Sequence, residues 1–142
     1  MSYFSALDVS ASGLSVQRAR MDLISQNIAN VNTTRTEDGT PYRRQTLSVS
    51  AERTTPFSEY FSKAQGAMKA TINGVNIDQS ELGRIYDPSN PDADEEGYVL
   101  MPNVSIVEEM VDMISATRSY EANTTAMDAS KNMAMQAINI GN

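Results

Sequence analysis

Residues 104–140, VSIVEEMVDMISATRSYEANTTAMDASKNMAMQAINI, contain neither proline nor glycine. Within this stretch one set of positions recurs at alternating spacings of four and three residues, which is the period of a helix face that packs against another helix. The stretch therefore predicts a helix of roughly 55 Å, capped by Asn103 or Ser105 after Pro102. The positions of the repeat are Ile106, Met110, Met113, Thr117, Tyr120, Thr124, Met127, Lys131, Ala134 and Ile138.

A second amphipathic helix is predicted from Phe4 to about Val31, where an apolar residue returns every seventh position at Leu7, Leu14, Met21 and Ile28. It should end around residues 30–32, because asparagine readily takes the left-handed conformation that closes a helix. Gly13 costs about 1 kcal/mol relative to alanine inside a helix. Close approach of another backbone would explain this glycine, and a tolerated defect is the alternative.

The segment between the two helices carries strand and turn patterns. Residues 42–52 alternate in the manner of a half-buried strand, with Leu47, Val49 and Ala51 on one side. In residues 68–79, Asn73-Gly74 predicts a tight hairpin turn between two short strands. The acidic run 87–97 predicts an exposed loop that leads into a short strand over residues 98–101. Residues 54–67 show no period, and no element is assigned to them.

The predicted fold is therefore mainly α with a small β insert. Long N- and C-terminal helices, residues 1–34 and 103–142, pack as a coiled-coil-like pair, and residues 35–102 form an insert that contains a β-hairpin. Short strands cannot cover two such long apolar stripes, so the helices must pack on each other and keep surface for further subunits. The apolar residues predicted to form this assembly interface are Leu7, Leu14, Met21, Ile28, Ile106, Met110, Met113, Tyr120, Met127 and Ile138.

Composition excludes several kinds of chemistry. The 142 residues include no His and no Cys, which removes the usual general base, the thiol nucleophile and the commonest metal ligands. The net charge of −7 argues against binding to nucleic-acid phosphates. Nine Met and no Trp favour adaptable helix surfaces over a rigid aromatic core. We therefore predict a protein that is not an enzyme and needs no cofactor.

Two acidic patterns resemble functional sites, one a catalytic carboxylate pair and the other a calcium-binding loop. Glu108 and Glu109 point about 100° apart on a helix, so they form no converging acid–base pair and are interpreted as a solvated helix face. In the acidic run, Asn90, Asp92 and Asp94 alternate as the first ligands of an EF-hand loop do. The glycine and the final bidentate glutamate of that motif are replaced by Glu95 and Met101, so a solvated loop without metal is preferred.

The beginning of the chain does not resemble a secretory signal. MSYFSALDVSASGL has no basic residue before Arg18 and no long apolar run, and no stretch approaches the roughly 20 apolar residues of a spanning helix. We therefore expect a soluble chain that keeps its first residues. The Asn-X-Ser/Thr triplets at Asn32, Asn103 and Asn123 are then chance matches to a glycosylation motif.

The N-terminal stretch SALDVSASGLSVQRARMDLISQNIANVNTTRTEDGTPYRRQ resembles the axial proteins of the bacterial flagellum, in which an SGL segment runs into NIAN and then Asn-Thr. The similarity continues in YDPSNPDADEEGYVLMPNV and VEEMVDMISATRSYEANTTAMDASKNM, and it points to the proximal-rod members of this rod and hook family. Residues 54–80 carry little of it. The resemblance adds Asn27, Asn30 and Asn32 to the predicted interface.

The resemblance implies a structural subunit of the proximal rod, the drive shaft that crosses the periplasm and serves motility. Its terminal helices would form the inner domain of the rod, and its insert would form the outer one. The implied partners are other copies, other rod proteins, the rod-base adaptor and the flagellar type III export apparatus, which exports subunits without cleaving a signal peptide. The alternative is a helical-hairpin adaptor or chaperone that binds one partner helix along its methionine stripe.

Overall fold

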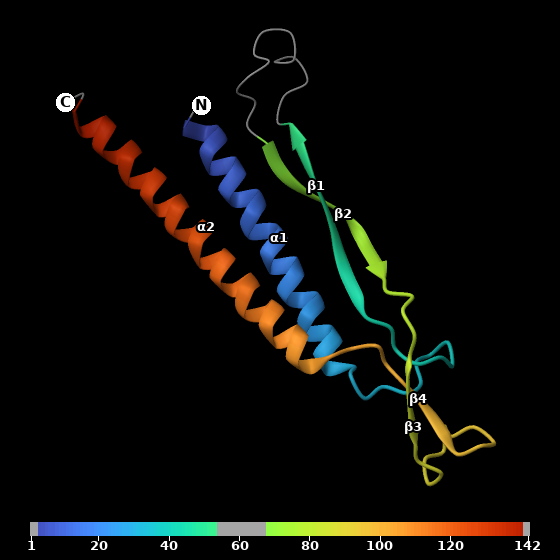
Figure 1. The fold of residues 1–142 in the computed structure, drawn as a ribbon. Coiled ribbons are helices and arrows are strands. Elements are labelled where there is room, and N and C mark those ends of the chain that lie inside the picture. The colour runs from blue at the N-terminus through green and yellow to red at the C-terminus, as the bar shows by residue number, and fades with distance from the viewer. Residues whose placement is uncertain (1–2, 54–67, 141–142) are drawn as a thin grey trace.

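The computed structural model describes residues 3–53 and 68–140, and the unassigned stretch 54–67 lies outside this part of the chain. The element order is helix, four strands, helix. Helix α1 spans Tyr3–Ala29 and helix α2 spans Ile106–Ile140, which confirms both predicted helices to within two residues at each described end. The helices lie side by side and antiparallel, so both termini are at the same end of the molecule (Figure 1).

Side chains close the two helices at the ends that face the insert. Asn30 Nδ2 donates to Gln26 O at 2.9 Å, and Thr33 Oγ1 donates to Asn30 Oδ1 at 3.2 Å. The expected left-handed asparagine is wrong, because only glycines have positive φ in the described part of the chain. A hydrogen-bonded turn satisfies the last carbonyls instead. At the start of α2, Ser105 is the cap and its Oγ accepts from the Glu108 N–H at 3.5 Å.

Strands β1 (Gln45–Arg53) and β2 (Met68–Ile77) form a long antiparallel pair, and β3 (Gly83–Tyr86) pairs with β4 (Tyr98–Met101). The predicted strands over residues 42–52 and 98–101 are confirmed. The predicted turn at Asn73-Gly74 is wrong, since β2 continues through it. Ser48 pairs with Gly74 and Val49 with Ile72, which leaves Asn73 as the extra residue of a β-bulge. The 9 residues of β1 form backbone hydrogen bonds with β2 on both sides of the bulge. A hairpin between two short strands within residues 68–79 would form fewer such bonds.

Helix α1 lies in the middle of three layers, with α2 on one side and the β1–β2 hairpin on the other (Figure 1). The β3–β4 hairpin extends beyond the end of the helix pair that is away from both termini. The expected packing of the helices on each other is confirmed. The hairpin also covers α1 lengthwise, because β2 continues through the predicted turn as one strand of 10 residues.

The described core is small. The apolar side chains buried in it belong to Val16, Ile24, Tyr42, Val99 and Ala116. Many large apolar side chains remain exposed on β2 and α2 instead, including Val107 at 72% and Val111 at 62%. A single copy therefore leaves much of its apolar surface in water. Among the described helices, none is both long and apolar enough to cross a bilayer.

Candidate assembly site

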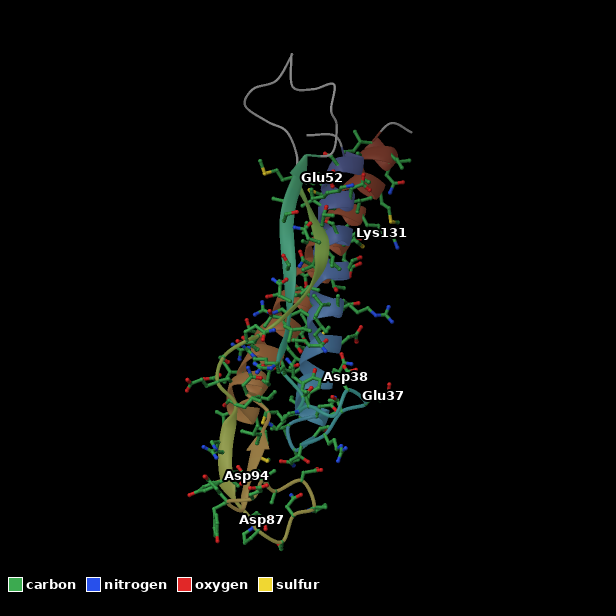
Figure 2. The ribbon with its side chains drawn as sticks, turned by 90° about the vertical axis from the view of Figure 1, so that its right-hand side faces the viewer. Glu37, Asp38, Glu52, Asp87, Asp94 and Lys131 are labelled. Atoms are coloured by element: carbon green, nitrogen blue, oxygen red, sulfur yellow. The ribbon has the colours of Figure 1, made fainter. Side chains whose placement is uncertain are left out.

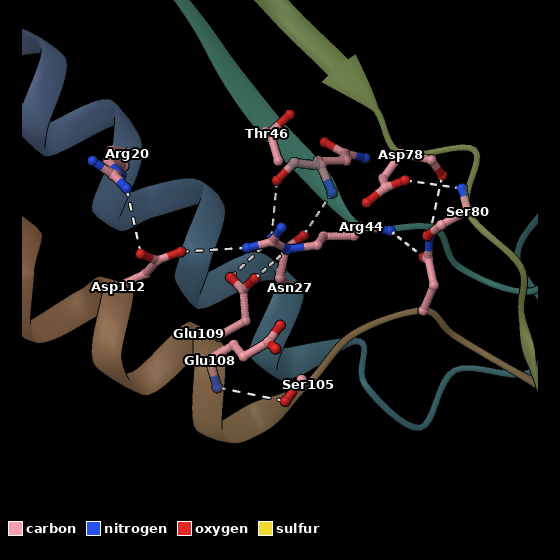
Figure 3. A network of polar contacts seen from close by, with 12 residues as sticks. Arg20, Asn27, Arg44, Thr46, Asp78, Ser80, Ser105, Glu108, Glu109 and Asp112 are labelled. Carbon is pink, nitrogen blue, oxygen red and sulfur yellow. Dashed lines mark hydrogen bonds and ion pairs between the residues drawn. The ribbon is translucent and has the colours of Figure 1, made fainter.

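Asn27, the first asparagine of NIAN, is the centre of a buried group of polar side chains at the junction of α1, β1 and α2 (Figure 3). Its Nδ2 donates to Gln45 O at 2.9 Å and to Glu109 Oε2 at 3.0 Å. Its Oδ1 accepts from the Tyr42 hydroxyl at 2.9 Å and from the Gln45 N–H at 3.0 Å. Both donors and both acceptor positions of the amide are thus used, and one residue of α1 holds two other segments in place.

Glu109 has only 1% of its surface exposed, so its interpretation as part of a solvated helix face is wrong. Its Oε1 accepts from Arg44 Nε at 2.6 Å, and Arg44 also reaches Asp112 at 3.3 Å. Asp112 in turn lies 3.4 Å from Arg20 of α1. The cation that pairs with Glu109 is 65 residues away in the sequence, so helix spacing alone gave no sign of it. Glu108 is exposed, as predicted.

These six residues are called the polar cluster below: Arg20, Asn27, Tyr42, Arg44, Glu109 and Asp112. Burial raises the pKa of the Tyr42 hydroxyl, and the negative charge of Glu109 raises it further, so this hydroxyl remains a donor to Asn27. The hydrogen bond to Glu109 raises the pKa of Arg44. Breaking a buried ion pair by removing one partner typically costs about 3–5 kcal/mol, because the remaining charge has no compensation.

Asn103 makes a second connection between the insert and the start of α2. Its Oδ1 accepts from the Arg44 N–H at 2.8 Å, and its Nδ2 donates to Asp78 O at 3.2 Å and to Ser80 Oγ at 2.7 Å. The Ser80 N–H donates to the Asp78 carboxylate at 2.9 Å and lowers the pKa of that carboxyl. The predicted capping alternative at Asn103 is therefore wrong, because its side chain binds the two segments that flank the β1–β2 pair.

The acidic run lies at the β3–β4 end of the molecule, where Figure 2 labels Asp87 and Asp94. Its side chains bind their own loop and its neighbour. Asp94 accepts from the Tyr98 N–H at 2.8 Å and from the Glu96 N–H at 3.0 Å, and these bonds lower the pKa of its carboxyl. Asp92 accepts from Thr34 Oγ1 at 2.8 Å, which attaches the loop to the segment after α1. Within residues 3–53 and 68–140, no group of three or more acidic side chains is placed to hold a metal ion.

A cavity of about 420 Å³ lies beside the polar cluster, between α1, β1 and α2. Its walls include the apolar side chains of Val16, Ile24 and Leu47 as well as Arg20 and Arg44. The carboxylates that border it, Glu109 and Asp112, are each paired with an arginine. This arrangement fixes elements relative to one another and presents no activated nucleophile or free base.

The residues predicted to form an assembly interface occupy different environments. Asn27 lies inside the subunit, Asn30 is half-buried and closes α1, and Asn32 is exposed. The heptad residues Leu7, Leu14, Met21, Ile28, Met113 and Met127 are half-buried, whereas Ile106, Met110, Tyr120 and Ile138 are exposed. Their role between subunits remains a prediction.

The contact between α1 and α2 uses smaller and more polar residues than the predicted heptad positions. Ala116 is fully buried in it, and a Cβ added at Gly13 would lie 3.1 Å from the side chain of Asn123. The close approach that explains Gly13 is thus made by a side chain and not by another backbone. Because these positions are small, the two helices approach closely and the larger heptad side chains lie at the edge of the contact.

Tyr42, Arg44, Glu109, Asp112 and Asn103 were not predicted as site residues. The NIAN motif was the sequence signal that pointed to this region, and it correctly drew attention to Asn27. The other members come from segments far apart in the chain, and none has a spacing that marks it.

Comparison with known proteins gives two family matches. Residues 7–35 match the model described as "Flagella basal body rod protein", and residues 95–140 match "Flagellar basal body rod FlgEFG protein C-terminal". The polar cluster residues of both helices fall inside these ranges, whereas Tyr42 and Arg44 lie between them.

Similar full-length proteins carry the name "Flagellar basal-body rod protein FlgC". The relative from Bacillus subtilis is 46% identical over 150 aligned positions, which cover 99% of this chain and 99% of the relative. The relative from Borreliella burgdorferi is 44% identical, and the alignment covers 99% of this chain and 98% of the relative. The relative from Salmonella typhimurium is 33% identical, with 99% of each chain covered.

Proposed function

Since this chain belongs to the FlgC family of flagellar basal-body rod proteins, we propose that it builds the proximal rod by packing its terminal helices against those of neighbouring subunits. Its membership makes it a structural subunit of the basal-body rod. The observation that supports polymerisation is the exposed apolar surface of α2, which extends from Val107 near one end to Ile140 at the other. Side chains of this size are not left in water along a whole helix in a protein that acts alone.

The proposal assigns the helix pair, residues 1–34 and 103–142, to the inner part of the rod, and residues 35–102 to its outer part. The polar cluster supports this division, because it joins the insert to the helix pair through hydrogen bonds and an ion pair. A subunit of a torque-bearing shaft needs a fixed angle between its inner and outer parts, and side chains that are satisfied on every side provide it.

We further propose that the neighbours of this chain are other copies, other rod proteins and the rod-base adaptor. The flagellar type III apparatus would export it to the periplasm without removing a signal peptide. This route is the one that the resemblance of the N-terminal stretch to flagellar axial proteins implies.

The function is tested in a motile strain whose own copy is replaced by a variant lacking residues 1–31. We expect loss of hook-basal bodies and of swimming, together with accumulation of the variant inside the cell. A variant with the single exposed substitution Gln79→Ala, outside the predicted interface, serves as the control and should swim normally. Normal flagella in the deletion strain would contradict the proposal.

A further inference from the structure

The contact between α1 and α2 has two unlike edges. Along one edge Arg20 bonds to Asp112, and the rest of the polar cluster continues this line. Successive residues of a helix point about 100° apart, so Met21 and Met113, which follow Arg20 and Asp112, point to the opposite edge. The short distance of 3.6 Å between Thr117 Oγ1 and Met21 Sδ lies on that second edge.

Apolar side chains of both helices line this second edge, which is called the valley below. Both predicted heptad stripes face it, and none of its members is fully buried by the subunit itself. Side chains in this condition are what a third helix covers when it packs against a pair. The valley is defined by Leu14, Met21, Ile28, Met113, Thr117 and Tyr120.

Helix α2 carries an exposed row of apolar side chains, called the ridge below, that could fill such a surface. Val107, Val111 and Ile114 follow the spacing of four and three residues, and they are 72%, 62% and 56% exposed. At 100° per residue their mean direction is more than 120° from that of Ala116, which faces α1. This ridge therefore points away from α1, and the chain that carries it cannot place it in its own valley.

Opposite charges lie beside the valley and beside the start of the ridge. Arg18 is exposed on α1 near the valley, Glu108 is exposed on α2 next to Val107, and Arg118 continues the line of the ridge one turn beyond Ile114. Within the described residues, these three side chains form no ion pair. Arg18 beside the valley and Glu108 at the start of the ridge favour the approach of one surface to the other.

We propose that the ridge of one copy, Val107, Val111 and Ile114, packs into the valley of the next copy. This inference rests on the proposed function and assigns its contact surfaces. The two surfaces are different, so the contact is heterologous, and repetition of it gives a ring or an open helical array and not a closed pair.

Cysteine cross-linking tests the contact directly, because the chain has no cysteine of its own. Valley variants Leu14→Cys and Met21→Cys are each combined with a ridge variant, Val107→Cys, Val111→Cys or Ile114→Cys, in strains that depend on the variant for motility. Hook-basal bodies are purified, oxidised and separated on a non-reducing gel. We expect dimers and higher multiples of this chain in at least one combination, and none with a valley or ridge cysteine alone.

The alternatives give different results. Multiples formed by a ridge cysteine alone would indicate a contact between identical surfaces and overturn the proposal. Cross-links only to a different rod protein, or none in any combination, would also overturn it. If the chain were missing from hook-basal bodies altogether, the proposed function itself would fail, and that result is visible on the same gel after reduction.

A charged substitution provides a second measurement. Val111→Glu is exposed in the single subunit, so its circular dichroism and thermal unfolding should match those of the unchanged chain. We expect its incorporation into hook-basal bodies to fall at least tenfold. Ser15→Glu, on the exposed side of α1 away from the valley, is the matched control. Equal incorporation of Val111→Glu and Ser15→Glu would contradict the ridge assignment.

Discussion

Replacing Asn27 by alanine should destabilise the subunit far more than replacing the nearby Asn32. The substitution removes four hydrogen bonds and leaves the Tyr42 hydroxyl and Glu109 Oε2 without their partner in a buried place. An unsatisfied buried polar group costs about 1–3 kcal/mol, so two such groups cost about 4 kcal/mol. Gln45 as a residue is only half-buried, so the loss of its two bonds should add less.

The expected loss is a large part of the 5–15 kcal/mol by which a typical domain is stable. At roughly 3 °C per kcal/mol for a domain of this size, the midpoint of thermal unfolding should fall by about 12 °C. Urea unfolding of the full chain, followed by far-ultraviolet circular dichroism, measures the free energy directly. Asn32→Ala should change it by less than about 0.5 kcal/mol.

A loss of less than about 1 kcal/mol for Asn27→Ala would refute the reasoning, because it would mean that the cluster is open to water. Asn27→Asp tests the same point through pH. It places a second carboxylate about 3.0 Å from Glu109, the distance of the present hydrogen bond. Repulsion by the neighbouring negative charge raises the pKa of the introduced carboxyl in the folded state above the unfolded value of about 4. The extra destabilisation should therefore be full at pH 7 and should shrink as the pH falls toward 4.

Three further predictions concern other parts of the chain. Gly13→Leu should destabilise the subunit by about 1–3 kcal/mol through overpacking against Asn123, and Asn123→Ala in the same chain should recover part of the loss in urea unfolding. The bonds of Asp94 lower the pKa of its carboxyl in the folded state. They therefore stabilise the folded loop fully above the unfolded pKa of about 4, and this stabilisation is lost as the pH falls through the lower folded pKa. The protection factors of amides in the acidic run, which are corrected for the intrinsic exchange rate at each pH, should fall on acidification, and Asp94→Asn should abolish this dependence. In a dilute monomer the amides at the ends of both helices away from the polar cluster should exchange quickly, because helices gain most of their stability from packing. Strong protection there would mean that the helices are stable without neighbouring subunits, and it would contradict this prediction.

Local pattern was sufficient for the elements that depend on neighbouring residues. The two helices follow from long runs without proline or internal breaks, and β4 follows from an apolar run after an acidic loop. The bulge in β2 was not predicted, since Asn73-Gly74 has the same local preference in a turn and in a bulge. Only the ladder with β1, more than 20 residues earlier, selects the bulge.

The sequence by itself determined that this chain has two long helices around a small β insert, that it lacks the residues of common catalytic sites, and that it belongs with flagellar rod proteins. Tertiary structure alone decided which helix faces meet and where charge is buried. Helical period states which residues share a face but not which face is covered, so the small residues at Gly13 and Ala116 form the contact while the heptad stripes remain at its edge. The burial of Glu109 depends on Arg44, 65 residues away, and such a pairing exists only once the chain has folded.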